Sequence, residues 1–359
     1  MNAFNYSIII PHKNAPNLLQ RCLDSIPQRS DLQIIVVDDN SDESEVDFGN
    51  FPGCNRANVE LYFTKEGGGA GYARNVGLSH ACGTWLLFAD ADDYFNYCIN
   101  DILDEYAAVD ADLIFFNANS VDSQTYVQQS KSKHLNQYIS LWNSDSHVAE
   151  LYLRYIFGEP WCKMVRRNLL TNNGILFDET RVHNDTKFSY LVGYYAKKIQ
   201  VDSRALYTYT VRSGSISALP NQKWKFYVRI DVFGQKDLFF LNHDVPIHDD
   251  RHFKALYSFL RVKDFEGFKC AYHKLVEMGF DKRYIDKSLA LCLAKNSVLS
   301  LTYCICFVPL LSVKLYALFY LFFYSIPQYI KLHVLGLHNK NIECRSVSYT
   351  HLRSPRDKR

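Results

Sequence analysis

The sequence of 359 residues lacks the cysteine patterns that mark metal sites or disulfide scaffolds. Its ten cysteines form no Cys-x-x-Cys pair and no cluster with the spacing of zinc ligands. The amino terminus also lacks a basic segment followed by a long apolar run, so no signal peptide is expected. We therefore expect reduced thiols and a cytoplasmic location.

An excess of charge is missing too. The 40 basic and 38 acidic residues nearly cancel, the formal net charge is +2, and we expect no nucleic-acid partner. Aromatic residues, by contrast, are abundant at 15%, with 25 tyrosines and 24 phenylalanines. This surplus suggests sugar-stacking surfaces or a membrane interface, although plain core packing explains most of these residues.

Two nucleotide-binding signatures are absent. The glycine run at residues 67–71 does not satisfy the G-x-G-x-x-G pattern, because Tyr72 stands where the last glycine belongs, and no Walker loop is present. What remains is a flexible loop before a helix, where backbone N–H groups and Arg74 can meet phosphate. A turn that merely needs glycine explains the run equally well.

Two apolar runs near the amino terminus predict neighbouring parallel strands. Residues 6–10 and 34–37 are rich in β-branched side chains, and the apolar residues between them recur at helical spacing. A strand, a helix and a strand form a right-handed βαβ unit, which makes the two strands parallel. Polar residues follow both strands, at 11–14 and 38–41, so both strands are expected to build one polar rim.

The most informative stretch is residues 85–94, where an apolar run ends in three carboxylates. Residues 85–89 predict a strand that is buried on both faces of a parallel sheet. Asp90, Asp92 and Asp93 follow at its carboxyl end, where open α/β sheets bind ligands. Taken alone, these carboxylates fit either a divalent-metal site or a solvated turn.

Six motifs in a fixed order give the chain a family resemblance. They are Ser7-Ile8-Ile9-Ile10-Pro11 with Asn14, Ile34-Ile35-Val36-Val37-Asp38-Asp39-Asn40-Ser41, Ala73-Arg74-Asn75-Val76-Gly77-Leu78, Phe88-Ala89-Asp90-Ala91-Asp92-Asp93, Pro160-Trp161-Cys162-Lys163, and Asn184-Asp185-Thr186-Lys187-Phe188. With them the chain resembles glycosyltransferase family 2, the inverting nucleotide-sugar enzymes with the GT-A fold, from about residue 6 to residue 217. The resemblance implies an α/β fold whose Rossmann-like, mostly parallel sheet is flanked by helices.

The resemblance also implies a pocket for a nucleotide-sugar donor. Pro11 and Asp39 would line the base and ribose, with Asp39 at the edge of a uracil-type ring. Asn14 and Asp38 belong to the same two motifs and are expected to bind the donor as well. His12 stands where the family more often has Tyr, so the pocket departs from the family pattern at that position.

The donor diphosphate and a metal ion are expected at the next motifs. The resemblance places Arg74 near the base or diphosphate, and Arg212 fits a diphosphate contact or a turn residue. Asp90 and Asp92 would be the family's D-x-D pair, with Asp92 bound directly to the metal and Asp90 facing the ribose or a metal-bound water. Carboxylate ligands favour Mn²⁺ or Mg²⁺, which would stabilise the leaving diphosphate. Asp93 is expected to support the site or to cap a helix.

Asp185 matches the aspartate that acts as general base in the family, where it would deprotonate the acceptor hydroxyl. Asn184 replaces the glutamate that usually precedes it, and His183 comes before both. His183 fits a metal, diphosphate or acceptor contact, or a structural histidine, and Trp161 fits an acceptor-sugar platform or a core residue. Without the resemblance, an amino-terminal helix cap would be the simpler role for Asp185.

The pattern along the chain predicts its organisation. Residues 1–220 would form the glycosyltransferase domain, with a nucleotide-sugar-binding half at 1–118 and an acceptor half at 119–220. The polar segment at 120–143 predicts a long loop or a mobile flap. Residues 221–295 predict an amphipathic helical extension.

The carboxyl end predicts contact with a membrane. Within the hydrophobic segment 296–335, Lys314 divides two uncharged runs, and each is shorter than the roughly 20 residues that a spanning helix needs. The basic tail at 336–359 suits anionic headgroups. We expect peripheral or monotopic association with the inner face of the cell membrane and a lipid-linked acceptor. A transmembrane span and a hydrophobic subdomain or oligomer contact are the alternatives for this segment.

Together these expectations describe an inverting, metal-dependent glycosyltransferase of the hexosyl- or N-acetylhexosaminyltransferase class. It would transfer a sugar from a nucleotide donor, in particular a UDP-sugar, to a saccharide or lipid-linked saccharide in cell-surface polysaccharide or lipopolysaccharide synthesis. A metal-dependent nucleotidyltransferase and a non-catalytic sugar-nucleotide-binding protein are the alternatives, since both also need carboxylates at the rim of a sheet.

Overall fold

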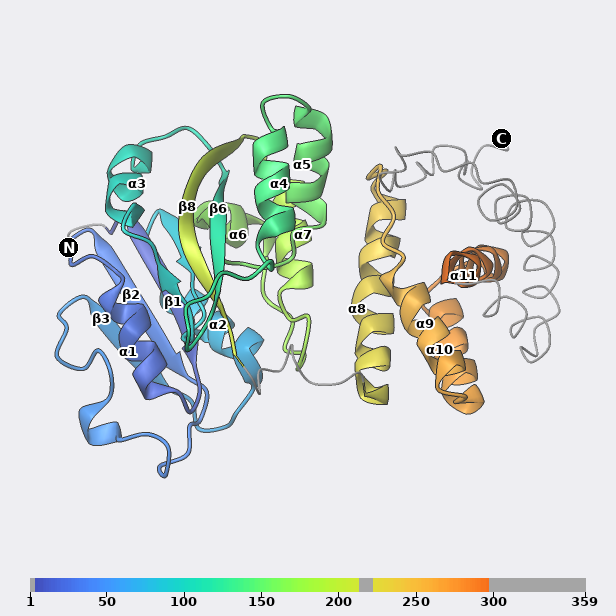
Figure 1. The fold of residues 1–359 in the computed structure, drawn as a ribbon, viewed down its shortest axis with the longest axis horizontal. Coiled ribbons are helices and arrows are strands. Elements are labelled where there is room, and N and C mark those ends of the chain that lie inside the picture. Colours follow the sequence, from blue (N-terminus) through green and yellow to red (C-terminus); the bar gives the residue numbers. More distant parts are fainter. Residues whose placement is uncertain (1–3, 213–221, 297–359) are drawn as a thin grey trace. The chain divides into compact units, whose positions relative to one another are not determined.

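The computed structural model describes residues 4–212 and 222–296. The chain divides into two compact units, of which the first ends at Ala255 and the second begins at Leu256. The first unit holds an eight-stranded sheet with helices packed on it (Figure 1). The predicted α/β class is confirmed.

The order of strands in the sheet is β3-β2-β1-β4-β7-β6-β8-β5. Among the described residues, β1–β2, β1–β4, β2–β3 and β6–β8 are parallel pairs, whereas β4–β7, β6–β7 and β5–β8 are antiparallel. The sheet is therefore mostly parallel, as expected. The strands are β1 (Tyr6–His12), β2 (Leu32–Asp38), β3 (Val59–Phe63), β4 (Trp85–Phe88), β5 (Tyr94–Phe95), β6 (Leu113–Asp122), β7 (Lys163–Arg166) and β8 (Ile199–Val211).

Strands β1, β2 and β4 are buried along their whole length, which explains their unbroken apolar runs. Pro11 lies within β1, where a missing N–H group could break the ladder. The carbonyl of Ile9 accepts a hydrogen bond from Ala89 N–H, so alternate residues of β1 face β4. Pro11 therefore faces the space beyond the end of β4, and no ladder hydrogen bond is lost there.

The helices of the first unit are α1 (Pro16–Asp24), α2 (Gly69–His80), α3 (Ile99–Tyr106), α4 (Lys133–Leu141), α5 (Ser146–Tyr155), α6 (Arg167–Asn173), α7 (Thr186–Tyr195) and α8 (Lys223–Asn242), with the short 3-10 helix Phe48–Asn50. Helix α2 packs on β1 and β2, and α4 packs on β6 and β8. A Cβ atom at Gly77 of α2 would lie 2.5 Å from Cγ2 of Ile9, so glycine lets this helix approach the sheet closely.

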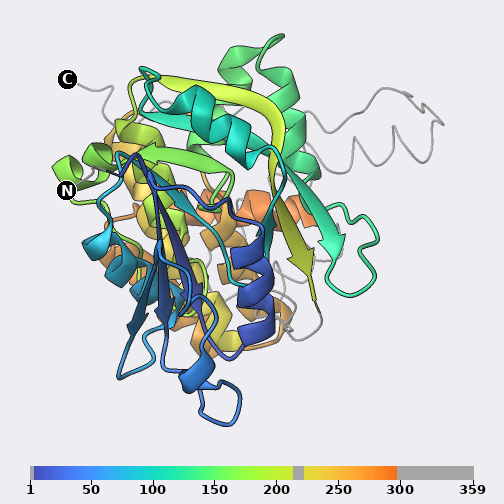
Figure 2. The same ribbon diagram turned by 90° about the vertical axis from the view of Figure 1, so that its left-hand side faces the viewer.

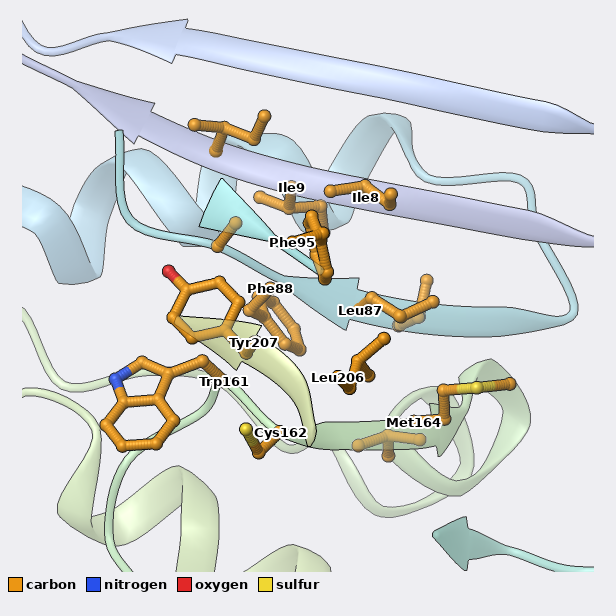
Figure 3. Close-up of a cluster of buried hydrophobic side chains, with 14 of the residues drawn as sticks. Ile8, Ile9, Leu87, Phe88, Phe95, Trp161, Cys162, Met164, Leu206 and Tyr207 are labelled. Carbon is orange, nitrogen blue, oxygen red and sulfur yellow. The ribbon is translucent and has the colours of Figure 1, made fainter. Parts of the chain in front are cut away.

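The far half of the sheet is formed by long curved strands that run side by side. β6 and β8 pair in parallel from Leu113↔Ile199 to Asp122↔Val211, with register shifts near Phe116 and Asn117 (Figure 2). Side chains from β1, β4 and β8 meet under them in one core, where Phe88, Phe95 and Tyr207 lie close together (Figure 3). The ends of β4 and β8 are thereby held in a rigid core.

Two predictions about local structure were wrong. Residues 120–143 are not one long loop, because β6 continues to Asp122 and α4 follows. Leu135 and Ile139 are buried one helical turn apart, and the Asn136 side chain bonds both backbone groups of Ala118 at 3.0 and 2.8 Å. These two buried side chains and the Asn136 amide hold the polar segment in an ordered helix. The run of apolar and β-branched residues at 206–211 also predicts a last core strand from Leu206, but β8 begins earlier, at Ile199.

The second unit is helical in its described part. Helix α9 (Arg251–Arg261) leads into it, and α10 (Phe265–Glu277) and α11 (Lys282–Asn296) follow. The Tyr272 hydroxyl donates a 2.9 Å hydrogen bond to Asp286 and so joins α10 to α11. Within the described ranges, every helix is too short or too polar to cross a bilayer. The predicted membrane-associating segment at 296–335 and basic tail at 336–359 lie outside those ranges, apart from residue 296.

Candidate active site

The polar rim forms at the carboxyl ends of β1, β2 and β4. The register of β1 with both neighbours brings their ends to one edge of the sheet. Parallel strands place ligand-binding residues at such an edge. Asp38 is the last residue of β2, Asp39 follows it, and Asp90 lies two residues beyond the end of β4, so all three lie at this edge.

Asp38 holds the rim together. Its carboxylate accepts hydrogen bonds from His12 Nδ1 at 2.7 Å and from Ser41 N at 2.9 Å. Burial raises the pKa of Asp38, but hydrogen bonds from His12 and Ser41 outweigh burial and keep it below its usual value. Asn14 ties the same loops together, because its amide oxygen accepts from Asp42 N and its N–H donates to Ser41 Oγ, each at 2.8 Å. Asp38 and Asn14, which are both predicted to bind the donor, thus also make hydrogen bonds that hold these loops in place.

Asp39 fastens the glycine-rich loop. Its two carboxylate oxygens accept hydrogen bonds from Gly68 N at 2.8 Å and Gly69 N at 2.9 Å. Lys13 Nζ donates to the Asp39 backbone carbonyl at 2.7 Å. The Asp39 carboxylate therefore holds the glycine-rich loop at the point where α2 begins. The predicted contact of Asp39 with a base stays a prediction.

Arg74 links three parts of the site. From α2, its Nη2 atom lies 2.5 Å from Asp90 Oδ1 and its Nη1 atom lies 2.9 Å from Asn184 Oδ1. The side chain is buried, and its Nε atom has no hydrogen-bond partner in the described structure. A Cβ atom at Gly71 would lie 2.0 Å from the Asp178 carbonyl, so a glycine there lets the 178–185 segment pack against α2.

Asp92 is paired with Arg212, which follows the end of β8. Arg212 Nε lies 2.7 Å from Asp92 Oδ2. Burial and then the charge of Asp90 raise the pKa of Asp92, while Arg212 lowers it. The predicted diphosphate residues Arg74 and Arg212 thus each lie against one aspartate of the predicted D-x-D pair.

Asp93 has a structural position, as expected. It is fully buried and accepts hydrogen bonds from Thr210 N at 2.6 Å and from the Tyr207 hydroxyl at 2.9 Å. The Tyr207 hydroxyl in turn accepts from Asp90 N at 2.8 Å. Burial, followed by the charges of Asp90 and Asp92, raises the pKa of Asp93. Asp93 therefore fixes the backbone that presents the other two aspartates.

The residues at this rim fit a divalent cation. Asp90 and Asp92 supply hard carboxylate oxygens, and their mutual repulsion raises the pKa of Asp92, although burial raises it more. Among the described residues, no three His, Cys, Asp or Glu side chains cluster as a metal cage. Mg²⁺ commonly takes one or two carboxylates and completes its shell with phosphate oxygens and water. The pair would thus hold a metal together with the donor.

Asp185 lies at the amino-terminal cap position of α7, yet its side chain makes no capping hydrogen bond. The carboxylate is half-buried. Burial and then the charge of Glu159 raise its pKa to about 6, against the influence of Arg74. Asp185 therefore does not cap α7 through its side chain, because a cap is defined by a hydrogen bond to a backbone N–H group of the first turn. The group has the proton affinity of a base that works near neutral pH.

Lys163 is buried on β7, close enough to Asp185 for the two charges to interact. Its ammonium donates to the Phe157 carbonyl at 2.9 Å and to Ser189 Oγ at 3.0 Å. Burial lowers its pKa to about 7, and Glu159 and Asp185 oppose that shift. Sequence reasoning did not assign Lys163 or Glu159 to the site, although the Pro160–Lys163 motif contains one and adjoins the other.

His183 and Trp161 were predicted near the acceptor. His183 has a φ of +60°, and its ring packs edge-on against Phe233 of α8 with centroids 4.9 Å apart. Trp161 is 7% exposed and stacks on Tyr207 at 5.6 Å (Figure 3). Little of its surface is left for a sugar, so its role as a platform stays a prediction.

Sequence reasoning missed the basic side chains of α8 and of the start of α9 near His183. Arg229 Nε lies 3.5 Å from His183 Nε2, and the guanidinium of Arg251 lies 3.9 Å from the centroid of the Phe233 ring. Burial, followed by Arg229, Arg251 and Lys225, lowers the pKa of His183 to about 4. The recurrence of basic residues at helical spacing from 225 to 236 was the available signal.

Comparison with known sequences gives a consistent family. Residues 7–173 match the family model Glycosyl transferase family 2. Glycosyltransferase GlyA of Streptococcus pneumoniae is 22% identical over 71% of this chain and 37% of its own length. YibD of Escherichia coli, an uncharacterized glycosyltransferase, is 27% identical over 73% of this chain and 79% of its own. Poly(ribitol-phosphate) beta-N-acetylglucosaminyltransferase TarS of Staphylococcus aureus is 27% identical over 58% of this chain and 35% of its own.

The fold has a counterpart among solved structures. The structure of S. aureus TarS residues 1–349 in complex with UDP-GlcNAc superposes with a TM-score of 0.58 at 19% identity, covering 88% of this chain and 90% of that one. At this identity the likeness concerns the fold alone. The ordered motifs and the matched family model agree, and residues 7–173 form a glycosyltransferase family 2 domain.

Proposed function

We propose that the protein is an inverting, metal-dependent glycosyltransferase that transfers a sugar from a UDP-sugar to a saccharide acceptor. One observation carries the proposal: Arg74 lies between Asp90 of the strand rim and Asn184, the neighbour of Asp185. With this arrangement, the carboxylates that we propose to bind the donor and the candidate base would lie on either side of one guanidinium. In an inverting transfer, leaving group and attacking hydroxyl lie on opposite sides of the anomeric carbon.

We assign the transfer of the acceptor's hydroxyl proton to a residue of the chain itself. With its pKa raised to about 6, Asp185 is mostly ionised at neutral pH and can accept the proton of an acceptor hydroxyl. Arg74 keeps a positive charge beside Asp90 and near Asp185, which favours an anionic donor between them. A divalent cation held by Asp90 and Asp92 would neutralise charge that develops on the leaving diphosphate.

The relatives support a choice of donor and pathway. A structural neighbour is described in complex with UDP-GlcNAc, and a sequence relative is named as a poly(ribitol-phosphate) beta-N-acetylglucosaminyltransferase. We infer a hexose or N-acetylhexosamine from a UDP-sugar as the transferred group. The acceptor would be a saccharide or lipid-linked saccharide of a cell-surface polymer. We also propose that the enzyme works in the cytoplasm and associates with the inner membrane face through residues 296–335.

The test uses the purified full chain with a panel of UDP- and GDP-sugars, with Mn²⁺, Mg²⁺ or EDTA. We expect slow hydrolysis of one UDP-sugar that stops in EDTA and returns with the metal. Release of pyrophosphate from a nucleoside triphosphate and a sugar phosphate would instead indicate a nucleotidyltransferase. Donor binding without turnover, with every metal and with saccharide acceptors present, would indicate a binding protein.

A further inference from the structure

Lys163 of β7 is a buried cation whose hydrogen-bond partners are neutral. The residue is 2% exposed, and its ammonium donates to two uncharged oxygens, the Phe157 carbonyl and Ser189 Oγ. Lys236, which is 1% exposed, shows the usual arrangement, because its ammonium lies 3.0 Å from Asp249 Oδ2. A lysine that is buried against neutral groups needs another explanation.

The cost of burying the Lys163 charge is only partly compensated. Burial lowers the pKa of Lys163 to about 7, although the charges of Glu159 and Asp185 raise it. The ammonium lies 4.4 Å from the centroid of the Phe157 ring, which is a cation–π contact. An uncharged side chain of similar length, such as methionine, would fill the same space without this cost. We therefore expect the ammonium to serve a purpose other than packing.

The ammonium holds two segments of the chain together. Ser189 lies in α7, one helical turn after Asp185. Its Oγ atom bonds the Lys163 ammonium and also donates to the Gly158 carbonyl, so the segment 157–158 and α7 share one set of hydrogen bonds. Ser189 N donates to the Asp185 carbonyl at 2.9 Å. Lys163 is thus linked to the backbone of Asp185 through a single residue.

The position of the Asp185 carboxylate depends on such links, because its own helix does not hold it. The side chain makes no capping hydrogen bond to α7. Arg74 holds the preceding residue, Asn184, at 2.9 Å, and Lys163 holds the turn that follows. The backbone that carries the candidate base is therefore fixed on both sides. A shift of about 1 Å in a reacting group can cost about 10²-fold in rate.

The other end of α7 is anchored in a comparable way. Arg154 of α5 donates from Nη1 to the carbonyls of Gly193 and Ala196, both at 2.6 Å. A Cβ atom at Gly193 would lie 2.1 Å from the Arg154 carbonyl, so α5 and α7 are in close contact there. Arg154 offers a matched control, because it anchors the same helix by two hydrogen bonds at the end remote from Asp185.

We propose that Lys163 is a positioning residue of the transfer reaction, whose ammonium fixes the start of α7 and thereby holds Asp185 in place for the attacking hydroxyl. The proposal rests on the function proposed above, because Asp185 needs a fixed position only if it takes the proton of that hydroxyl. It gives the lysine of the Pro160-Trp161-Cys162-Lys163 motif a part in catalysis through the backbone of another residue.

The first experiment compares Lys163→Met with Arg154→Met in donor hydrolysis, where water replaces the acceptor. Calorimetric titration of the full chain with UDP and Mn²⁺ gives the concentration of folded enzyme, so unfolded protein does not enter kcat. We expect Lys163→Met to lose about 10- to 100-fold in kcat, with KM for the donor and the affinity for UDP within about twofold of wild type. Arg154→Met should keep kcat within about threefold.

Hydrogen exchange tests the link itself without turnover. We expect the amides of residues 189–191 to exchange about tenfold faster in Lys163→Met than in the wild type. In Arg154→Met the faster exchange should fall at the far end of α7 instead. Ser189→Ala removes the hydroxyl but keeps the ammonium, and it should show smaller changes of the same kind in kcat and in exchange. If Lys163→Met does not fold, Ser189→Ala decides by the same comparison with Arg154→Met.

Unchanged kcat in Lys163→Met would overturn the proposal, and so would an equal loss in Arg154→Met, because then any loosening of α7 slows the reaction. A loss in KM or in UDP affinity, with kcat unchanged, would also overturn it. A wild type that hydrolyses no donor with any metal would contradict the proposed function. In that case, faster exchange confined to 189–191 in Lys163→Met would still show that Lys163 fixes the start of α7, and unchanged exchange there would refute it.

Discussion

Arg74 and Asp90 form a 2.5 Å ion pair between helix α2 and the end of strand β4. The second arm of the same guanidinium holds Asn184 at 2.9 Å. One side chain thereby couples the strand rim to the segment that carries Asp185. At Asn184, Arg74 meets a neutral amide rather than a second carboxylate, so only one of its two partners carries a charge.

The planar fork of Arg74 is the first target for mutation. Arg74→Lys keeps the charge but cannot contact Asp90 and Asn184 together, since an ammonium is a single point. We expect a loss of about 1.5–3 kcal/mol of transition-state stabilisation, or roughly 10- to 100-fold in kcat/KM for the donor. Steady-state donor hydrolysis checks this, with Lys198→Gln as the control. Unchanged kcat/KM would contradict the linking role.

The base assignment predicts a separation of binding from chemistry. Asp185→Asn retains the shape of the side chain but cannot take a proton. We expect transfer to fall by about 10²- to 10⁴-fold. Binding of UDP with Mn²⁺, measured by calorimetry, should stay as in the wild type. Full transfer activity in this variant would remove Asp185 from the catalytic role.

The raised pKa of Asp185 predicts the acid limb of the pH profile. The carboxylate must be ionised to act as a base, and its pKa is about 6. The transfer rate should therefore be level above pH 7 and fall about tenfold per pH unit below 6. A limb with its midpoint near pH 4 would mean that burial and Glu159 do not shift this group.

The same shift predicts a gain in stability for Asp185→Asn. A folded-state pKa of about 6 against a usual value of 3.8 means that the folded state binds the proton more tightly. Above pH 6 the ionised carboxylate destabilises the fold, and this penalty disappears as the pH falls toward 4. Urea unfolding should show the variant more stable than wild type at pH 7.5, with a smaller difference at pH 5. Equal differences at both pH values would count against the shift.

The Tyr207 hydroxyl predicts a structural effect at the D-x-D pair. It donates to Asp93 Oδ2 and accepts from Asp90 N, so Tyr207→Phe removes one hydrogen bond from each of these groups. We expect a loss of about 1–3 kcal/mol in the free energy of unfolding. Urea denaturation measures it, and Tyr97→Phe at a tyrosine that is 95% exposed serves as comparison. A loss no larger than in that control would show that water replaces the hydroxyl.

Much of the sheet could be predicted, because strands buried in a parallel sheet have continuous apolar sequences. Residues 6–10, 34–37 and 85–89 all lie in or beside such strands. Helix α4 could not, since its order depends on the amide of Asn136 meeting Ala118 and on two buried side chains. Sequence periodicity does not contain that long-range pairing.

The site shows the same division. The three carboxylates after β4 were visible in the sequence, and so was the structural place of Asp93. The pairing of Arg212 with Asp92 was not, because the two residues are 120 positions apart and meet only through the antiparallel contact of β5 with β8. The basic residues of α8 were visible as a pattern, but their proximity to His183 needed the fold.

The hydrogen bonds from Gly68 and Gly69 to Asp39 have a consequence for selectivity. A glycine loop at a helix start would ordinarily attract any small anion. Here the protein's own carboxylate occupies those two N–H groups, so the loop is closed to free phosphate. The Asp39 carboxylate therefore competes with free anions for these two N–H groups.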